Sequence, residues 1–494
     1  MTFLSRILGL IRDIFIAKLF GVSGLTDAFL VAFRIPNFFR RLFAEGAFSQ
    51  AFIPILASAK STGDEQKVQD TINHIGTKLL SVLIVITLIA VVAAPLVVFA
   101  FAWGFYFDTD PTKFNLTSDM LMITFPYLLL ISLTAFSGSI LNTYDKFAVP
   151  AFTPVLLNVS IILSAIYLSE YLETPIMALA WGVLIGGIVQ LMFQIPFLIK
   201  IKKIPKPVKG NHPAIKTLKK RMLPALFGVS VSQINLLIDT MIASLLISGS
   251  ITWLYYSDRL LELPLALIGI ALATVALAKL SNHFANQDSE KFTQTINHAL
   301  KLGLILGAPA CFGLLFLAEP LMITLFHYDA FSVNDAHQAS LSLIAYGSGL
   351  MAFILVKILA PVFLSRGDTK TPVKVGVIAM LSNVVLNAIL AYFYSHVGLA
   401  IATSISAVIN AALLYYYLNK QNIYRFPVNL MRVLIKVILA SLIMVAFILF
   451  FVENTQNYLQ GDVWFRVYQL SLTIALSAGI YFLILQILGV RLSK

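Results

Sequence analysis

Apolar segments of about 20 residues follow one another along almost the whole chain, and an α-helix of that length crosses the hydrocarbon core of a bilayer. The 494 residues are 59% hydrophobic and only 12% charged. Soluble proteins carry roughly twice that share of charged residues. The sequence therefore predicts an all-α, polytopic membrane protein rather than a set of soluble domains.

Loop charges give the topology of the predicted helices. Basic residues gather in alternate loops and acidic residues in the loops between them. Because basic loops stay in the cytoplasm, this alternation predicts an even number of spans and places both termini in the cytoplasm. The same rule explains the net charge of +12, so we expect no nucleic-acid partner. About 14 spans are predicted, at about 2–20, 26–57, 77–103, 119–143, 150–169, 175–200, 219–247, 252–282, 298–325, 337–365, 372–394, 398–419, 430–452 and 464–489.

A short motif opens both halves of the chain. The segments Ile11–Leu19 and Leu237–Leu245 share Asp, Ile, Ala and Leu in register. Because six spans separate them, both halves enter the membrane in the same direction, which predicts two lobes related by an axis along the membrane normal, with a cavity between them. The predicted parts are an N-terminal lobe (1–200), a basic cytoplasmic linker (201–218), a C-terminal lobe (219–420) and a charge-poor, lipid-facing helix pair (421–494).

Charged side chains inside three predicted spans indicate an anionic ligand. One charge at bilayer depth costs about 3 kcal/mol, and a guanidinium group fits phosphate or carboxylate through two parallel hydrogen bonds. Helix-end charges and structural ion pairs are the alternative explanation. We predict a cationic transport cavity lined by Arg6, Arg12, Arg34, Arg40 and Arg259. The predicted charge partners are Asp13, Asp27, Glu45 and Asp258.

A second polar set lies deep in the predicted C-terminal lobe, and it comprises Asp239, Asn383, Asn387 and Thr403. The two asparagines are four residues apart and share a helix face. Oxygen ligands at this depth can hold Na⁺ or relay a proton. A hydrogen-bond network between helices explains the set at least as well, so both interpretations stay open.

Catalytic motifs are absent from the sequence: it contains no P-loop and no metal-spaced histidine pair. We therefore expect a transporter rather than an enzyme, with no organic cofactor. Na⁺ or H⁺ coupling and the membrane potential are the expected energy sources. His327 and His396 fall in predicted outer loops and are expected at the surface.

Several motifs closely resemble the MurJ (MviN) lipid II flippases, which belong to the multidrug/oligosaccharidyl-lipid/polysaccharide (MOP) exporter superfamily. The resemblance covers essentially the whole chain. The segments that carry it are Ser5–Asp13, Thr26–Phe29, Asn37–Pro54, Tyr255–Leu260, Lys357–Phe363 and Lys370–Lys374.

The resemblance implies an alternating-access transporter of the bacterial inner membrane that serves peptidoglycan synthesis. Its implied substrate is lipid II, the undecaprenyl-pyrophosphate-linked disaccharide pentapeptide, carried from the cytoplasmic to the outer leaflet, with the last two helices guiding the polyprenyl tail. A monomer among membrane lipids is expected, with a cell-wall synthesis complex as a further partner. The family's essential cationic positions correspond to Arg6, Arg12, Arg40 and Arg259, and further sensitive positions to Asp27, Asn37 and Glu45.

Other functions remain open at this point. A flippase for another undecaprenyl-linked saccharide would share the cationic cavity. A drug or organic-cation antiporter of the same superfamily would need acidic residues as the dominant cavity charge. A membrane glycosyltransferase would need an acidic pair in a sizeable outer loop, and Asp108 and Asp110 fit solvated loop residues better. A structural subunit of a cell-wall complex is the remaining alternative.

Overall fold

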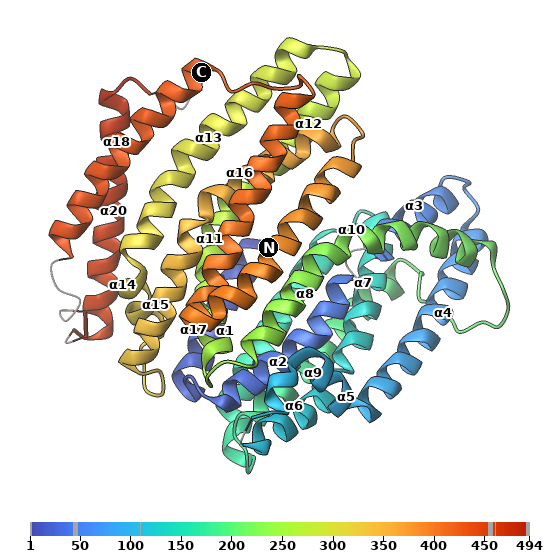
Figure 1. The fold of residues 1–494 in the computed structure, drawn as a ribbon. Helices are drawn as coiled ribbons and strands as arrows, with labels where there is room; N and C mark the ends of the chain where they lie inside the picture. The colour runs from blue at the N-terminus through green and yellow to red at the C-terminus, as the bar shows by residue number, and fades with distance from the viewer. Residues whose placement is uncertain (1, 43–47, 109, 453–457, 460, 491–494) are drawn as a thin grey trace. The chain divides into compact units, whose positions relative to one another are not determined.

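A computed structural model describes residues 2–42, 48–108, 110–452, 458–459 and 461–490 (Figure 1). Within these residues every regular element is a helix, which confirms the predicted all-α class. The chain divides into two compact units, Met1–Thr252 and Trp253–Lys494.

Among the described residues of the first unit there are ten α-helices. They are α1 (Thr2–Phe20), α2 (Gly24–Phe39), α3 (Ser49–Lys60), α4 (Glu65–Val92), α5 (Ala94–Ala102), α6 (Pro111–Thr124), α7 (Tyr127–Thr143), α8 (Ala148–Leu163), α9 (Met177–Lys200) and α10 (Pro213–Ala243). Short 3₁₀ turns cover Trp103–Phe105 and Ser169–Tyr171, and a π-turn covers Ser164–Leu168. A core of large apolar side chains, including Phe52, Ile72 and Phe136, joins α3, α4 and α7.

The remaining helices belong to the second unit, apart from the first turn of α11. They are α11 (Ser250–Pro264), α12 (Ala271–Ala285), α13 (Ser289–Phe316), α14 (Ala318–Phe326), α15 (Val333–Ser348), α16 (Leu350–Leu364), α17 (Lys370–Lys420), α18 (Val428–Phe451) and α20 (Val463–Ile487), with a π-turn over Leu265–Ile270. The last two helices lie side by side (Figure 1). A buried cluster that includes Ile305, Met444 and Tyr481 packs them against α13.

Loop aspartates begin several helices by accepting hydrogen bonds from exposed backbone N–H groups. Asp64 caps α4 through Gln66 and Lys67, both at 3.0 Å. Asp110, predicted to be a solvated loop residue, caps α6 through the Thr112 N–H at 2.9 Å. The hydroxyl and backbone amide of Thr112 lower the pKa of the Asp110 carboxyl. These acidic residues therefore fix helix starts as well as marking loops.

Helix α17 contains two of the predicted spans as two helical arms joined at a kink. Ser395 interrupts it with a non-helical φ of 53° and ψ of −135°, between the two predicted spans. Gly398 begins the second arm, and a Cβ atom there would lie 2.1 Å from the Leu390 carbonyl oxygen. Only glycine fits this close approach between the two arms.

We predict that Gly398→Ala lowers the free energy of unfolding by about 1–3 kcal/mol, because the added methyl group forces the two arms of α17 apart. Thermal unfolding of the purified protein measures the change. Gly479→Ala in α20 is the control, since its Cβ would meet nothing within 4 Å. An equal loss of stability in both variants would contradict the predicted clash.

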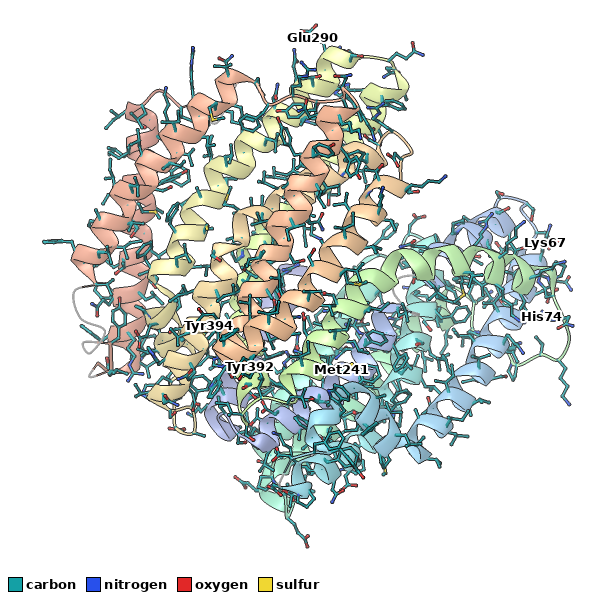
Figure 2. All side chains as sticks on the ribbon, in the orientation of Figure 1. Lys67, His74, Met241, Glu290, Tyr392 and Tyr394 are labelled. Atoms are coloured by element: carbon teal, nitrogen blue, oxygen red, sulfur yellow. The ribbon has the colours of Figure 1, made fainter. Side chains whose placement is uncertain are left out.

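Exposed aromatic side chains mark one end of the second unit. Tyr392 and Tyr394 lie exposed at the end of the first arm of α17, and Glu290 lies at the opposite end of this unit (Figure 2). Aromatic rings concentrate where a membrane meets water, so the Ser395 turn fits an interfacial position. His396 was predicted at the surface, and that prediction is wrong. It is only 3% exposed, because the turn directs its ring against Trp253, with 4.8 Å between ring centroids.

Ten segments of the described residues are long and apolar enough to cross a membrane, by length and composition. One of them is α17, which contains two predicted spans. The other three predicted spans overlap charged α1, short α2 with α3, and α10, whose side chains at 224, 225 and 227–232 lie outside the described residues. Every predicted span thus overlaps a helix, while the number of crossings stays a prediction.

The predicted limits of the lobes also stay predictions. Helix α10 was expected to open the C-terminal lobe, and in the structure it contacts α3, α4 and α5 of the first unit. The boundary at Thr252 separates two compact units, whereas the predicted lobes are defined by a sequence repeat. The boundary therefore does not show where the second copy of the repeat begins.

Candidate functional site

Arg12 on α1 forms a buried ion pair with the next residue, Asp13. Its Nε and Nη2 atoms donate to Asp13 Oδ1 at 3.0 and 2.6 Å. Its Nη1 atom donates to Asn158 Oδ1 on α8 at 3.2 Å. The guanidinium also lies 5.9 Å from the centroid of the Phe33 ring. The structure therefore brings together two predicted site residues and adds Asn158, which the sequence did not single out.

Arg40 follows the C-terminal end of α2, and Asn37 orients it. Arg40 Nε donates to Asn37 Oδ1 at 3.0 Å, and Asn37 Nδ2 donates to the Phe33 carbonyl oxygen at 2.9 Å. Pro36 lies within this last turn of α2. Asn37 thus connects the Arg40 guanidinium to the backbone of its own helix.

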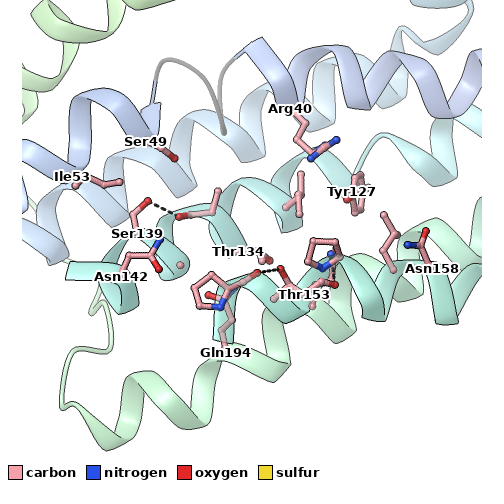
Figure 3. Close-up of a pocket in the computed structure, with 17 residues that line it drawn as sticks. Arg40, Ser49, Ile53, Tyr127, Thr134, Ser139, Asn142, Thr153, Asn158 and Gln194 are labelled. Carbon is pink, nitrogen blue, oxygen red and sulfur yellow. Dashed lines mark hydrogen bonds between the residues drawn. The ribbon is translucent and has the colours of Figure 1, made fainter. Parts of the chain in front are cut away.

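A cavity of about 330 Å³ opens beside Arg40 within the first unit (Figure 3). Residues of α3, α7, α8 and α9 complete its lining. Asn158, which bonds Arg12, also lines it, so Arg12 lies one side chain away from this space. Two of the predicted substrate-binding arginines therefore adjoin one cavity.

Arg34 and Arg6, the other predicted arginines of the first unit, lie elsewhere. Arg34 Nη1 donates to Thr240 Oγ1 on α10 at 2.8 Å. Arg6 is exposed on α1. The predicted charge partner Glu45 lies outside the described residues. The gathering of all the predicted residues around one ligand stays a prediction.

Asp27 caps a helix that is distant in sequence. Its carboxylate accepts hydrogen bonds from the Gly249 N–H at 2.6 Å, the Thr252 N–H at 2.9 Å and the Thr252 hydroxyl at 2.6 Å. Free N–H groups at a helix start favour such an acceptor. Asp27 therefore fastens the start of α2 to the first turn of α11.

Lys113 supports the same region, although it was not predicted as a site residue from the sequence. This buried side chain on α6 donates to Ser248 Oγ at 3.0 Å and lies 3.4 Å from Asp108 Oδ2. Its Nζ lies 4.5 Å from the centroid of the Phe105 ring. Lys113 is a basic residue in a predicted outer loop that is otherwise acidic, and this exception to the charge pattern could have identified it as a site residue.

Arg259 lies on the part of α11 that belongs to the second unit. Its Nη1 is 3.4 Å from Glu262 Oε2, and its Nη2 donates to the Tyr255 hydroxyl at 3.4 Å. The guanidinium carbon lies 5.6 Å from the Tyr255 ring centroid. The Arg259 side chain is 31% exposed, so it stays accessible, and the neighbouring Asp258 is exposed as well.

The structure unites three of the four polar residues proposed for a cation. Asn387 Nδ2 donates to Asn383 Oδ1 at 2.8 Å, and Asn383 Nδ2 donates to Thr403 Oγ1 at 3.4 Å, which links the two arms of α17. Asp239 belongs to the first unit, where Asn235 donates to it at 3.3 Å. These bonds match the hydrogen-bond network interpretation, and a Na⁺ or proton site stays a prediction.

Comparison with known proteins identifies the family. The family model described as lipid II flippase MurJ matches residues 16–469. The chain belongs to the MurJ family. A relative from Vibrio cholerae, named probable lipid II flippase MurJ, is 48% identical over 100% of this chain and 95% of its own length. The lipid II flippase MurJ of Burkholderia cenocepacia is 38% identical over 99% of this chain and 96% of its own length.

Solved structures of two kinds of transporter share the fold of this chain. A lipid II flippase MurJ in an inward closed conformation is 31% identical and superposes with a TM-score of 0.83, covering 99% of this chain and 98% of that one. A multidrug resistance MATE family transporter of the MOP superfamily, 14% identical, superposes with a TM-score of 0.70 over 85% of this chain and 94% of that one. These similarities confirm the MOP exporter fold and a multi-pass membrane protein.

Proposed function

We propose that this protein is a lipid II flippase, a transporter without a catalytic step. It carries the undecaprenyl-pyrophosphate-linked peptidoglycan precursor from the cytoplasmic to the outer leaflet of the bacterial inner membrane. Membership of the MurJ family supports this function. The observation that carries the proposal is the cavity with Arg40 in its wall and Arg12 beside it, since it offers cations to a diphosphate within an otherwise apolar helical protein.

The predicted topology supports entry of the headgroup from the cytoplasm. Asn142, Pro150 and Gln194 line the cavity near the ends of α7, α8 and α9 that join predicted cytoplasmic loops. The proposed transport starts from that side of the membrane. The diphosphate competes with Asp13 for Arg12, while the Asn37-oriented guanidinium of Arg40 takes a second anionic group.

Transport proceeds by alternating access, and the Asp27 cap is the contact that must break for outward opening. The predicted topology places the Gly249–Thr252 turn on the outer side. Its three hydrogen bonds to Asp27 hold the outer ends of α2 and α11 together. The predicted substrate-binding arginines move positive charge through the membrane field, which is worth about 2.3 kcal/mol per charge per 100 mV. Membrane potential therefore biases the inward-facing state, and Na⁺ or H⁺ coupling adds to it.

We predict that Asp27→Ala loosens the outer closure and lowers the free energy of unfolding by about 1–2 kcal/mol, because α11 loses its cap. A Ser250→Cys reporter, buried in this structure, is expected to react faster with a membrane-impermeant thiol reagent in the Asp27→Ala background. Asp110→Ala, which removes the cap of α6, is the control. If the thiol reagent modifies the reporter at the same rate in the Asp27→Ala and Asp110→Ala backgrounds, Asp27 does not hold the outer side closed.

Reconstitution tests the proposed function directly. Purified protein in liposomes that contain fluorescent lipid II should expose inner-leaflet headgroups to an external quencher. The comparison lipids are an undecaprenyl-diphosphate carrying a different saccharide and an organic cation. If the other undecaprenyl-linked saccharide is transported as fast as lipid II, the protein is a less selective saccharide-lipid flippase. If the organic cation is transported as fast, the protein is a cation transporter.

The proposal also includes a monomeric protein whose two termini both lie in the cytoplasm.

A further inference from the structure

Two carboxamide side chains lie buried beside the cavity of the first unit. Gln190 and Gln194 are four residues apart on α9, so they share one helix face. They are 1% and 0% exposed, and both line the cavity. Figure 3 shows Gln194 directed from α9 toward the same space as Asn142 and Thr153.

The hydrogen bonds of these carboxamides are incomplete. Gln190 Nε2 donates to the Thr153 carbonyl oxygen at 2.8 Å, whereas its Oε1 has no partner among the described residues. For Gln194, neither Oε1 nor Nε2 has a hydrogen-bond partner among the residues that the structure describes. An unsatisfied buried polar group costs about 1–3 kcal/mol, and such groups are rare in native proteins. Two on one face of a cavity indicate a ligand that completes them.

The missing hydrogen bonds define the chemistry of that ligand. The two carbonyl oxygens require N–H or O–H donors, which an ionised phosphate or carboxylate does not supply. The Gln194 amide group also requires an acceptor. Among the described lining residues only Arg40 is ionised, and the others add hydroxyls, carboxamides and apolar surface. A cavity of about 330 Å³ is within the usual size range of small-molecule sites.

We infer that this cavity binds the uncharged, amide- and hydroxyl-bearing part of the transported headgroup. Gln190 and Gln194 form hydrogen bonds with this part, and Arg40 binds the anionic group next to it. The inference rests on the proposed function and adds a source of selectivity that the arginines lack. Arginines alone would accept any lipid diphosphate. The shared chemistry is a secondary amide, which both an N-acetylated sugar and a peptide supply, and the sugar adds hydroxyls next to it.

Binding measurements on the full-length protein in nanodiscs test this inference. Three lipids are compared: lipid II, undecaprenyl diphosphate-N-acetylmuramic acid without peptide, and undecaprenyl diphosphate alone. Gln194→Leu is expected to weaken lipid II binding about tenfold and to leave undecaprenyl diphosphate binding unchanged. Loss with the peptide-free lipid as well assigns the site to the sugar, and loss with lipid II alone assigns it to the peptide.

Thermal stability separates recognition from a structural role. Because Gln194→Leu removes an unsatisfied buried group, its unfolding temperature should not fall. Gln194→Met serves as a second variant of similar shape. Ser132→Ala on α7 is the matched control, because this hydroxyl is also buried without a partner among the described residues but does not line the cavity. It should leave all three affinities unchanged.

Two results would overturn the inference. Unchanged lipid II affinity in both Gln194 variants would mean that the cavity holds water only. An equal loss of affinity for lipid II and for undecaprenyl diphosphate would mean a general disturbance of the site. Failure of the wild-type protein to bind lipid II at all would instead refute the proposed function, so the two failures are distinguishable.

Discussion

Replacing Arg12 by Ala is expected to lower the free energy of unfolding by about 3–5 kcal/mol, because it leaves the buried Asp13 carboxylate without the two bonds that Arg12 donates. Transport should be lost in the same variant. Thermal unfolding in detergent and flipping in liposomes measure the two effects. The size of the stability loss follows from burial, since Arg12 is 5% exposed and Asp13 is fully buried.

A charge-neutral double variant separates the two consequences. Arg12→Gln with Asp13→Asn removes both charges and keeps polar groups of similar shape, so most of the stability should return. Flipping should stay absent, because the Arg12 guanidinium that receives the diphosphate is gone and Arg40 already holds the second anionic group. Wild-type flipping by the double variant would show that the pair is purely structural.

Arg259→Ala is expected to reduce flipping about 30-fold or more, because it truncates one partner of the charge pair that Arg259 is proposed to form with the anionic headgroup, and such a truncation costs about 2–5 kcal/mol. Its stability should barely change, because its link to Glu262 is partly exposed and such ion pairs contribute little. The same liposome assay and a thermal unfolding scan provide the measurements.

Lys291→Ala is the matched control for Arg259→Ala. Lys291 forms an exposed ion pair with Asp288 at 2.9 Å, also in the second unit. It should leave both flipping and stability unchanged. Arg259→Lys, which keeps the charge and loses the planar fork, should fall between the two. Normal flipping by Arg259→Ala would remove this residue from the transport site.

The helical class, the family and the position of the break in α17 could be predicted from the sequence, because they depend on hydrophobic length and local motifs. The two spans placed at about 372–394 and 398–419 are the two arms that meet at Ser395. The surface position of His396 was predicted wrongly. Loop position alone does not show that a turn directs a ring inward against Trp253.

The charged part of the site was more predictable than its neutral part. Arg12 and Asp13 attract attention because a charge in an apolar segment has a large energetic cost. Gln190 and Gln194 carry no charge, so within apolar α9 they resemble ordinary polar substitutions. Their role emerges only when folding places them beside Arg40 and leaves their hydrogen bonds incomplete. Lys113 was missed because its partner Ser248 is distant in sequence.

The most direct test of lipid II flipping by this protein uses cells depleted of their own flippase. The wild-type protein, Arg259→Ala and Lys291→Ala are expressed in turn, and the labelling of lipid II headgroups by an external, membrane-impermeant probe is followed. The account predicts that labelling returns with the wild-type protein and Lys291→Ala, and stays at the depleted level with Arg259→Ala. Labelling that stays at the depleted level with the wild-type protein, or returns fully with Arg259→Ala, would contradict it.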